Sequence, residues 1–185
     1  ELCTIQRILQ GRSILIHSEW FIGQQLFLPE GLCINDLIVR NALYRPATLE
    51  SGSTQKYLDC KKGNVAPVYL WGTYNSLNTT YGVLVYQEQL AQMAREVGGF
   101  SLEDGVKLVK LISKKKVDKI HDMKDKFMEG AKAKECPKED SEEIWKMIEA
   151  GGGYLFNSSH ATAYAITSYV GAWLKANYPT AFYTI

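Results

Sequence analysis

The sequence predicts a mainly α-helical chain with an irregular, partly β N-terminal segment. From residue 87 onward, the signals for helix starts and stops follow one another with short gaps. In the stretch that begins at Asp118, apolar residues recur at spacings of three and four, the pattern of a helix with one buried face. Turn-forming residues gather instead between residues 46 and 80, where we expect a long irregular connection.

The first part of the chain contains few regular elements on this interpretation. Residues 14–16 have the apolar character of a short strand within an otherwise poorly patterned segment. Asn35 or Asp36 caps a helix that Pro46 stops. One short helix is expected near Lys56, inside the irregular connection.

The second half should form five helices, each bounded by recognisable residues. The first helix starts near Gln87 and ends at Gly98-Gly99, the second is capped by Ser101, and the third begins at Asp118. The fourth begins at Asp140 with Glu143, as in a capping box, and ends at Gly151-Gly152-Gly153. The fifth begins at Ser159 and is stopped by Pro179. A strand-like stretch over residues 81–89 leads into the first helix. The uncharged run over residues 161–174 is 14 residues long, which suits a buried core helix and is shorter than the about 18–20 residues of a membrane span.

Charge is uneven along the chain although the total is small. The 21 Lys and Arg nearly balance the 20 Asp and Glu, so the chain lacks the strongly basic composition typical of many nucleic-acid-binding proteins. Residues 101–134, however, contain ten Lys and six acidic residues, a net charge of +4. Residues 135–149 contain two Lys and six acidic residues, a net charge of −4. Any function that depends on charge must therefore come from local patches.

A strip of lysines lies on the helix that Ser101 begins. Lys107, Lys110 and Lys114 are spaced at i, i+3 and i+7 and so share one helical face. The apolar residues expected to pack inward on another face are Leu102, Val106, Val109 and Ile112. Such a strip binds phosphate groups in some proteins and is an ordinary solvated face in many others, and the spacing leaves both interpretations open.

The glycine turn over residues 151–153 forms a second candidate site. A glycine turn that leads into a helix can cradle phosphate with its backbone N–H groups, although the P-loop pattern is absent here. His160, in the first turn of the following helix, is then a donor to an anion, and the alternative is a core or capping histidine. Ser159 and His160 are helix neighbours that diverge by about 100°, so they do not form a nucleophile with its base.

The sequence predicts no metal site and no catalytic residue in this chain. Its four cysteines are widely spaced, with no C-x-x-C pair and no nearby pair of histidines, so we expect a reduced protein with buried or free thiols. The chain starts at Glu1 and has no Met before Met93, and we therefore expect a piece of a longer protein.

Five segments resemble, in order, the motifs of one family. They are residues 42–46 (ALYRP), 81–89 (YGVLVYQEQ), 108–116 (LVKLISKKK), 156–165 (FNSSHATAYA) and 168–179 (SYVGAWLKANYP). The set resembles the family C replicative DNA polymerases of bacteria, the alpha subunit of DNA polymerase III, and the resemblance covers roughly residues 34–185. The second segment resembles its family motif almost letter for letter.

The resemblance implies a helical fingers domain over residues 47–185 and a palm–fingers junction segment over residues 1–46. The residues that it implies at the phosphates of an incoming nucleotide are Lys110, Lys114 and His160. The residues that it implies at DNA or at the junction are Arg45, Lys107, Lys115, Lys116 and Gln87.

The resemblance also implies partners and a cofactor for the whole protein. Members of this family add deoxynucleoside triphosphates (dNTPs) to a primed template by two-metal phosphoryl transfer. We therefore expect template–primer DNA and dNTP as partners, Mg²⁺ as cofactor, and replisome subunits such as a sliding clamp bound through regions outside this chain. We expect no membrane partner and a location in the cytoplasm of a bacterial or phage-infected cell. The family's metal-binding aspartates lie in motifs that do not occur here, so we expect the isolated chain to be inactive.

The chain departs from the family pattern at three places. Val109 stands where the family usually has a second cation beside Lys110, and Ser158 stands where it has Lys or Arg. Ala47-Thr48 replaces a Gly-Pro pair that would stiffen the turn. Each lost cation lowers the affinity expected for a triphosphate. The alternatives are a stand-alone helical module that binds DNA or RNA through the lysine strip, and an inactive relic.

Overall fold

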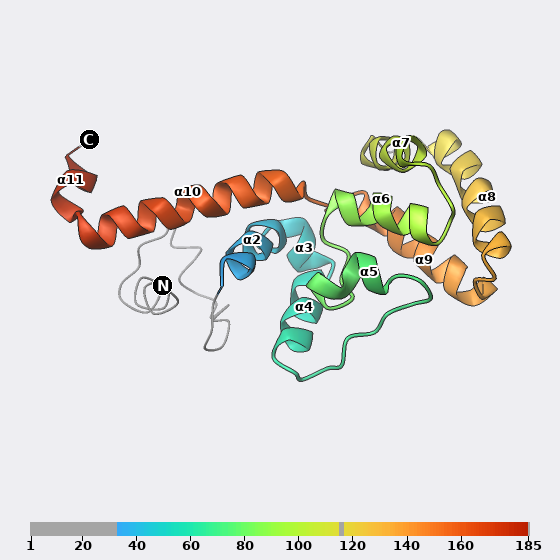
Figure 1. Ribbon diagram of the computed structural model, residues 1–185, viewed down its shortest axis with the longest axis horizontal. Coiled ribbons are helices and arrows are strands. Elements are labelled where there is room, and N and C mark those ends of the chain that lie inside the picture. The colour runs from blue at the N-terminus through green and yellow to red at the C-terminus, as the bar shows by residue number, and fades with distance from the viewer. Residues whose placement is uncertain (1–32, 115–116, 185) are drawn as a thin grey trace. The chain divides into compact units, whose positions relative to one another are not determined.

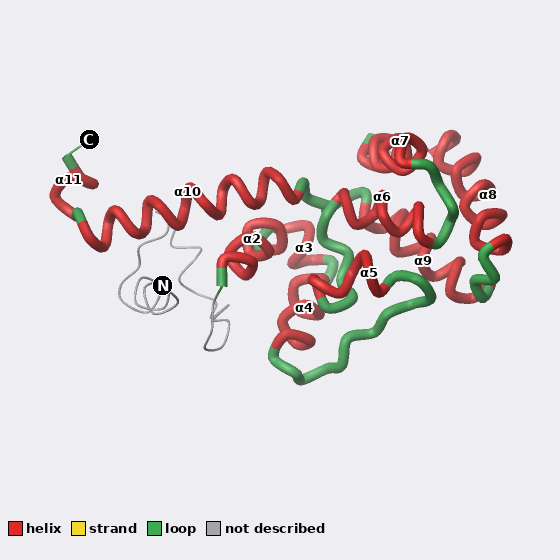
Figure 2. Tube along the Cα trace, viewed as in Figure 1, coloured by secondary structure: helices red, strands yellow, loops and turns green. Residues whose placement is uncertain are grey.

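The computed structural model describes residues 33–114 and 117–184. Its elements, labelled as in Figure 1, are α2 (Ile34–Leu43), α3 (Pro46–Glu50), α4 (Ser53–Lys61), α5 (Tyr74–Leu77), η2 (Asn78–Thr80), α6 (Gln87–Glu96), α7 (Leu102–Ser113), α8 (Val117–Ala133), α9 (Lys138–Gly151), α10 (Ser158–Asn177) and α11 (Pro179–Tyr183). Loops join these helices, and the described residues contain no β-strand (Figure 2). The prediction of a mainly helical chain is therefore confirmed, whereas the strand expected at residues 14–16 lies outside the described residues.

The described residues divide into two compact units. One comprises residues 33–41 and 159–184, and the other is Ala42–Ser158. In the first unit, the side-chain amide of Asn41 on α2 donates to the carbonyl oxygen of Ala161 on α10, at 3.4 Å. The division predicted between residues 46 and 47 concerns the parts of a larger protein and stays a prediction.

Residues 46–80 are more helical than predicted. Pro46 is the first residue of α3, a position at which proline is well tolerated because the N–H it lacks has no partner within the helix. The buried hydroxyls of Thr48 and Thr54 both donate to the carbonyl oxygen of Leu43, so they satisfy a carbonyl group that the end of α2 leaves open. Helices this short depend on tertiary contacts, which local turn signals do not reveal.

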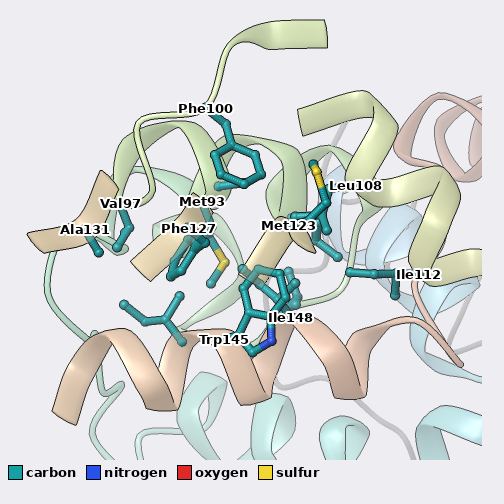
Figure 3. Packing of buried hydrophobic residues seen from close by; sticks show 14 of the residues in the cluster. Met93, Val97, Phe100, Leu108, Ile112, Met123, Phe127, Ala131, Trp145 and Ile148 are labelled. Atoms are coloured by element: carbon teal, nitrogen blue, oxygen red, sulfur yellow. The ribbon is translucent and has the colours of Figure 1, made fainter. Parts of the chain in front are cut away.

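The core of the larger unit is built mainly from α6, α7, α8 and α9. Phe127 and Trp145 are fully buried in it with ring centroids 5.3 Å apart, and the Phe100 ring centroid lies 6.2 Å from that of Phe127 (Figure 3). Met123 and Ala131 are buried on the same face of α8 as Phe127. This confirms the spacing of three and four that predicted the inward face of α8.

Helix α7 is rotated relative to the prediction. Gly105 faces α6, because a Cβ atom there would lie 3.1 Å from the carbonyl oxygen of Ala91. With Gly105 at the closest approach, the buried face continues through Leu108. The four residues predicted to face inward range from exposed to buried: Leu102 is 65% exposed, Val106 42% exposed, Val109 half-buried and Ile112 4% exposed. The prediction is therefore wrong at its first two positions.

The ends of α7 and α9 test the capping predictions. Ser101 caps α7 as predicted, and its hydroxyl accepts from the backbone N–H of Asp104 at 3.1 Å. Helix α9 instead begins at Lys138, before the predicted capping pair. Asp140 is used differently, since its carboxylate accepts from the backbone N–H of Trp71 at 3.1 Å. A tertiary hydrogen bond thus replaces the predicted local cap.

Helix α10 is not the buried core helix that its uncharged sequence predicted. Of its residues, Ala161, Ala165 and Ala172 are buried. The large apolar side chains over the same stretch are exposed: Tyr164 59%, Ile166 52%, Val170 47%, Trp173 37% and Leu174 40%. Helix α10 therefore packs through its alanines and leaves its bulky residues at the surface.

Candidate functional site

Two motif segments meet through the backbone just before α10. The backbone N–H of Phe156 donates to the carbonyl oxygen of Val85 at 3.0 Å, and that of Gln87 donates to the carbonyl oxygen of Phe156 at 2.9 Å. Together they form a single parallel bridge between Tyr86 and Phe156. The stretch predicted as strand-like is therefore reduced to this bridge, and α6 begins at once at Gln87.

Arg45 fixes the same loop from a third motif segment. Its Nε donates to the carbonyl oxygen of Ala42 at 2.9 Å, and its Nη2 donates to that of Tyr154. The guanidinium lies 4.5 Å from the centroid of the Phe156 ring, a cation–π arrangement. Burial lowers the pKa of Arg45 from its usual value. Within the described residues, Arg45 thus connects the end of α2 to this loop. Its predicted contact with DNA or a palm domain stays a prediction.

Glu88 caps the start of α10. Its carboxylate accepts from the side-chain amide of Asn157 at 3.0 Å and from the backbone N–H of Ser158 at 3.1 Å. A carboxylate is favourable here because the first N–H groups of a helix lack internal partners and carry positive partial charge. Burial first, and the Glu88 carboxylate second, raise the pKa of the Tyr86 phenol to about 12. An anionic ligand at this helix start would meet the charge of Glu88.

The glycine turn before this loop has a packing role. Gly152 lies against α7, where a Cβ atom would come within 2.1 Å of Cγ2 of Ile112. The missing side chain therefore lets the chain cross α7 closely. Together with the carboxylate of Glu88, this packing argues against a phosphate cradle at the glycine turn.

The buried side chain of Gln89 holds the second motif segment in place. Its Oε1 accepts from the backbone N–H groups of Val85 and Tyr86, each at 2.9 Å. Its Nε2 donates to the carbonyl oxygen of Ser76 at 3.1 Å and to the hydroxyl of Thr80 at 2.8 Å. Sequence reasoning named Gln87 instead and missed Gln89. A glutamine at the third position of a helix is the reciprocal half of a capping box, and this signal could have identified it.

The predicted lysine strip is exposed. Lys107 and Lys110 lie on α7, and Lys114 follows its last residue. Positive charge near the C-terminus of a helix is stabilising by itself, so exposure here agrees with both interpretations left open by the spacing. Lys115 and Lys116 lie outside the described residues. Val109 is uncharged and half-buried, so this position supplies no cation.

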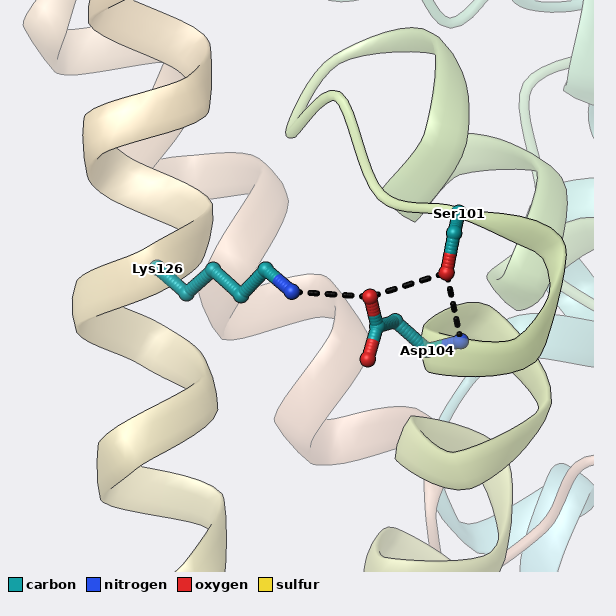
Figure 4. Close-up of polar contacts among 3 residues, drawn as sticks. All are labelled: Ser101, Asp104 and Lys126. Atoms are coloured by element: carbon teal, nitrogen blue, oxygen red, sulfur yellow. Dashed lines mark hydrogen bonds and ion pairs between the residues drawn. The ribbon is translucent and has the colours of Figure 1, made fainter.

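A polar contact anchors the start of α7 to α8. Lys126 Nζ lies 2.7 Å from the carboxylate of Asp104, which also accepts from the hydroxyl of Ser101 at 2.8 Å (Figure 4). The hydrogen bond from Lys126 is the main cause that lowers the pKa of Asp104, followed by that from Ser101, and the charge of Lys107 contributes. The lysine strip is therefore carried by a helix that is capped, packed through Leu108 and paired to its neighbour.

His160 lies in the first turn of α10 and is exposed, which excludes a core histidine. Its ring centroid is 4.5 Å from that of Tyr164, one helical turn further on. Lys107, Lys110 and Lys114 lie on α7 and at its C-terminal end, whereas His160 belongs to the other compact unit. A shared phosphate site for these residues stays a prediction.

Three further features of the described residues concern metal ligands, membrane-spanning helices and cysteines. Among the described residues, no group of three or more His, Cys, Asp or Glu is placed to hold a metal ion. None of the helices in residues 33–114 and 117–184 is long and apolar enough to cross a membrane. Of the described cysteines, Cys33, Cys60 and Cys136 are free thiols, and Cys3 lies outside the described residues.

The arrangement defines a helical domain whose motif segments lock one loop in place and whose charged helix remains open to solvent. Residues 29–135, more than half of the chain, match the family described as the bacterial DNA polymerase III alpha subunit finger domain. The chain therefore belongs to this finger-domain family.

Curated relatives agree with this assignment. The chain is 38% identical over 182 residues to DNA polymerase III subunit alpha of Borreliella burgdorferi, covering 97% of this chain and 16% of the relative. It is 40% identical over 152 residues to the protein of the same name in Aquifex aeolicus, covering 82% and 13%. The protein of that name in Caulobacter vibrioides is 40% identical over 183 residues, covering 97% and 16%. The chain thus spans about a sixth or less of the length of these relatives.

Proposed function

We propose that this chain is the fingers part of a replicative DNA polymerase that adds dNTPs to a primed template. We further propose that Lys110 and Lys114 contact the triphosphate of the incoming dNTP. The observation that carries the proposal is the exposed lysine strip on a firmly anchored helix, in a chain of the finger-domain family. In this proposal His160 also contacts the phosphates, and Arg45, Lys107 and Gln87 contact DNA or the junction.

The proposed role is electrostatic. A transferring phosphoryl group spreads negative charge over its oxygens, and pre-positioned cations stabilise that charge best when they need no rearrangement. Lysine supplies a compact ammonium with three donors, which suits a phosphate oxygen. With Val109 half-buried and Ser158 bonded to Glu88, Lys110 and Lys114 carry most of this interaction in the described residues.

Residues 33–114 and 117–184 do not fit a catalytic Mg²⁺ site. Two-metal phosphoryl transfer needs a cluster of oxygen ligands, and the described residues provide no such cluster. In the proposed polymerase, Mg²⁺ is held by the aspartates of the family motifs that do not occur in this sequence. The template–primer, the dNTP, replisome subunits such as a sliding clamp and the bacterial or phage-infected cytoplasm belong to the same proposal.

Nucleotide titration of the purified chain tests the role of the lysine strip. We expect the double variant Lys110→Gln/Lys114→Gln to lose roughly tenfold in dNTP affinity for each lysine removed, because each loses a charge-assisted hydrogen bond. The matched control is Lys56→Gln/Lys62→Gln, which removes two exposed lysines from α4 and the residue after it. Calorimetric titration with dATP checks the prediction, and equal affinities for the two double variants would refute the role.

The same preparation tests whether the chain acts alone. We expect no primer extension with Mg²⁺ and all four dNTPs, because the metal-binding carboxylates are absent from the described residues. Extension that depends on the added metal would show that this expectation is wrong. Salt-sensitive binding of DNA or RNA that is lost in Lys110→Gln/Lys114→Gln, without any nucleotide binding, would instead favour the stand-alone module. An inactive relic would bind neither.

A further inference from the structure

A second basic feature lies outside the lysine strip, between α8 and α9. A groove of about 590 Å³ runs along these two helices, which pack together and are joined by residues 134–137. Its lining includes four lysines, two on each helix: Lys124, Lys132, Lys138 and Lys146. The distribution of charge along the sequence does not reveal this set, because α9 as a whole is acidic.

The four lysines come in two pairs, one on each helix. Lys124 and Lys132 are eight residues apart on α8, and Lys138 and Lys146 are eight residues apart on α9, so each pair is separated by about 12 Å along its helix. The chain reverses direction between the two helices, so Lys132 and Lys138 lie near the connecting turn and the other two lie further away. Both helices therefore contribute lysines to the groove, near the connecting turn and away from it.

Little acidic charge opposes these lysines inside the groove. Glu142 is the acidic residue of the lining, and its carboxylate is 3.8 Å from Nζ of Lys138. Within the described part of the chain, Lys124, Lys132 and Lys146 form no ion pair. The lining as a whole therefore carries a net charge of about +3, from four lysines and one glutamate.

The rest of the lining is apolar or already hydrogen-bonded. Met128 lies between the two lysines of α8, and Cys136 is 9% exposed. Ser141 is buried, and its hydroxyl donates to the carbonyl oxygen of Lys138 at 2.8 Å. A ligand in this groove thus meets ammonium donors at the rims and apolar atoms between them.

We propose that this α8–α9 groove binds the phosphodiester backbone of a DNA strand. A strand supplies one negative charge per nucleotide, which matches lysines spaced along both rims, and its sugars can lie on the apolar floor. An acidic peptide fits less well, because its backbone amides would need partners that this lining does not provide. The proposal rests on the proposed function only in taking DNA as the partner, and it does not depend on the lysine strip of α7.

Binding of labelled oligothymidylate to the full 185-residue chain, followed by fluorescence anisotropy between 50 and 200 mM salt, tests the proposal. The groove variant is Lys132→Gln/Lys146→Gln, which leaves the pair of Lys138 and Glu142 intact. The control is Lys56→Gln/Lys62→Gln, which removes the same charge elsewhere on the larger unit. We expect the groove variant to lower the slope of log K against log salt by about 1.4, two contacts at about 0.7 each for a single strand. Between 50 and 200 mM salt, the affinity of the groove variant should therefore fall by a factor about sevenfold smaller than that of the wild-type chain.

Three results would overturn the groove as a DNA site. They are a wild-type chain that binds no oligonucleotide, a groove variant whose slope and affinity match those of the control, and displacement of the oligonucleotide by oligoglutamate at equal charge concentration. Circular dichroism on both variants shows whether the helices are retained. The role proposed for α7 fails separately, through nucleotide titration of Lys110→Gln/Lys114→Gln, so the two failures are distinguishable.

Discussion

Replacing Gly130 with alanine should destabilise the larger unit strongly. A Cβ atom at Gly130 would lie 1.9 Å from the carbonyl oxygen of Gly98 and 2.7 Å from its carbonyl carbon. Ordinary contacts begin at 3.4 Å, so the two backbones must separate by about 1.5 Å, which is 3.4 minus 1.9. Gly98 also packs closely on the Phe127 ring of the same helix, where a Cβ atom on Gly98 would lie 2.3 Å from Cδ2, so a separation at Gly130 also loosens this buried contact.

The expected cost follows from two opposing effects. Inserting a methyl group into a packed contact costs about 1–3 kcal/mol or more, whereas alanine is favoured over glycine inside a helix by about 1 kcal/mol. The new Cβ atom would clash with backbone atoms of Gly98, which cannot move aside as a flexible side chain can. We therefore expect a packing cost near 3 kcal/mol and a net loss of about 2 kcal/mol. The corresponding decrease in melting temperature is about 4–8 °C for a chain of this size.

The matched control is Gly153→Ala, in the same compact unit. No atom lies within 4 Å of the Cβ position at Gly153, and its φ is not in the left-handed region. We expect this change to be neutral or to stabilise by up to about 1 kcal/mol, because alanine restricts the unfolded chain. Urea unfolding followed by circular dichroism compares the two midpoints. Equal midpoints for Gly130→Ala and Gly153→Ala would refute the close packing of α8 on the loop at Gly98.

Two further predictions concern the motif segment before α6 and the anchor of α7. Gln89→Ala should lower the free energy of unfolding by about 3 kcal/mol, because the buried N–H groups of Val85 and Tyr86 lose their acceptor. The neighbouring change Gln87→Ala should cost less than about 0.5 kcal/mol. Similar urea midpoints for the two variants would contradict the role of Gln89. Because its hydrogen bond with Lys126 lowers the pKa of Asp104 in the folded state, the stabilising contribution of this carboxylate is present above its unfolded value of about 3.9 and is lost as the pH falls below it. Asp104→Asn should therefore be less stable than wild type near pH 7, and the difference should shrink as the pH falls below the unfolded value of about 3.9 and through the lower folded-state pKa. A stability difference that does not change with pH would show that the carboxylate is not the cause.

Local sequence signals were sufficient where one residue acts within one helical turn. Ser101 was recognised as the cap of α7, and the spacing of Met123, Phe127 and Ala131 placed the inward face of α8 correctly. Both depend on contacts between residues three or four apart, which a single sequence contains. These are the parts of the fold that could be predicted with their physical cause.

Prediction failed where a distant segment decides the local structure. Asp140 looked like a helix cap but bonds to the backbone of Trp71, 69 residues away. Leu102 looked like a core residue, but the close approach of Gly105 to Ala91 turns it outward. In α10, the small alanines rather than the bulky residues are buried. None of these outcomes follows from periodicity, because each depends on which element lies opposite.

The site shows why a motif that identifies a family need not contact the ligand. Residues 81–89 form the segment that most closely resembles the family pattern. The buried side chain of Gln89 in this segment makes four hydrogen bonds inside the protein. Glu88 and Arg45 likewise hold the loop before α10. Such residues are restricted by packing, so they identify the fold more reliably than they identify a binding surface. Charges that meet a polyanion must remain exposed, and the lysines for which we propose this role lie on α7 and along the α8–α9 groove. The small net charge is therefore compatible with DNA as a partner, because the acidic residues that balance these lysines lie largely outside both surfaces.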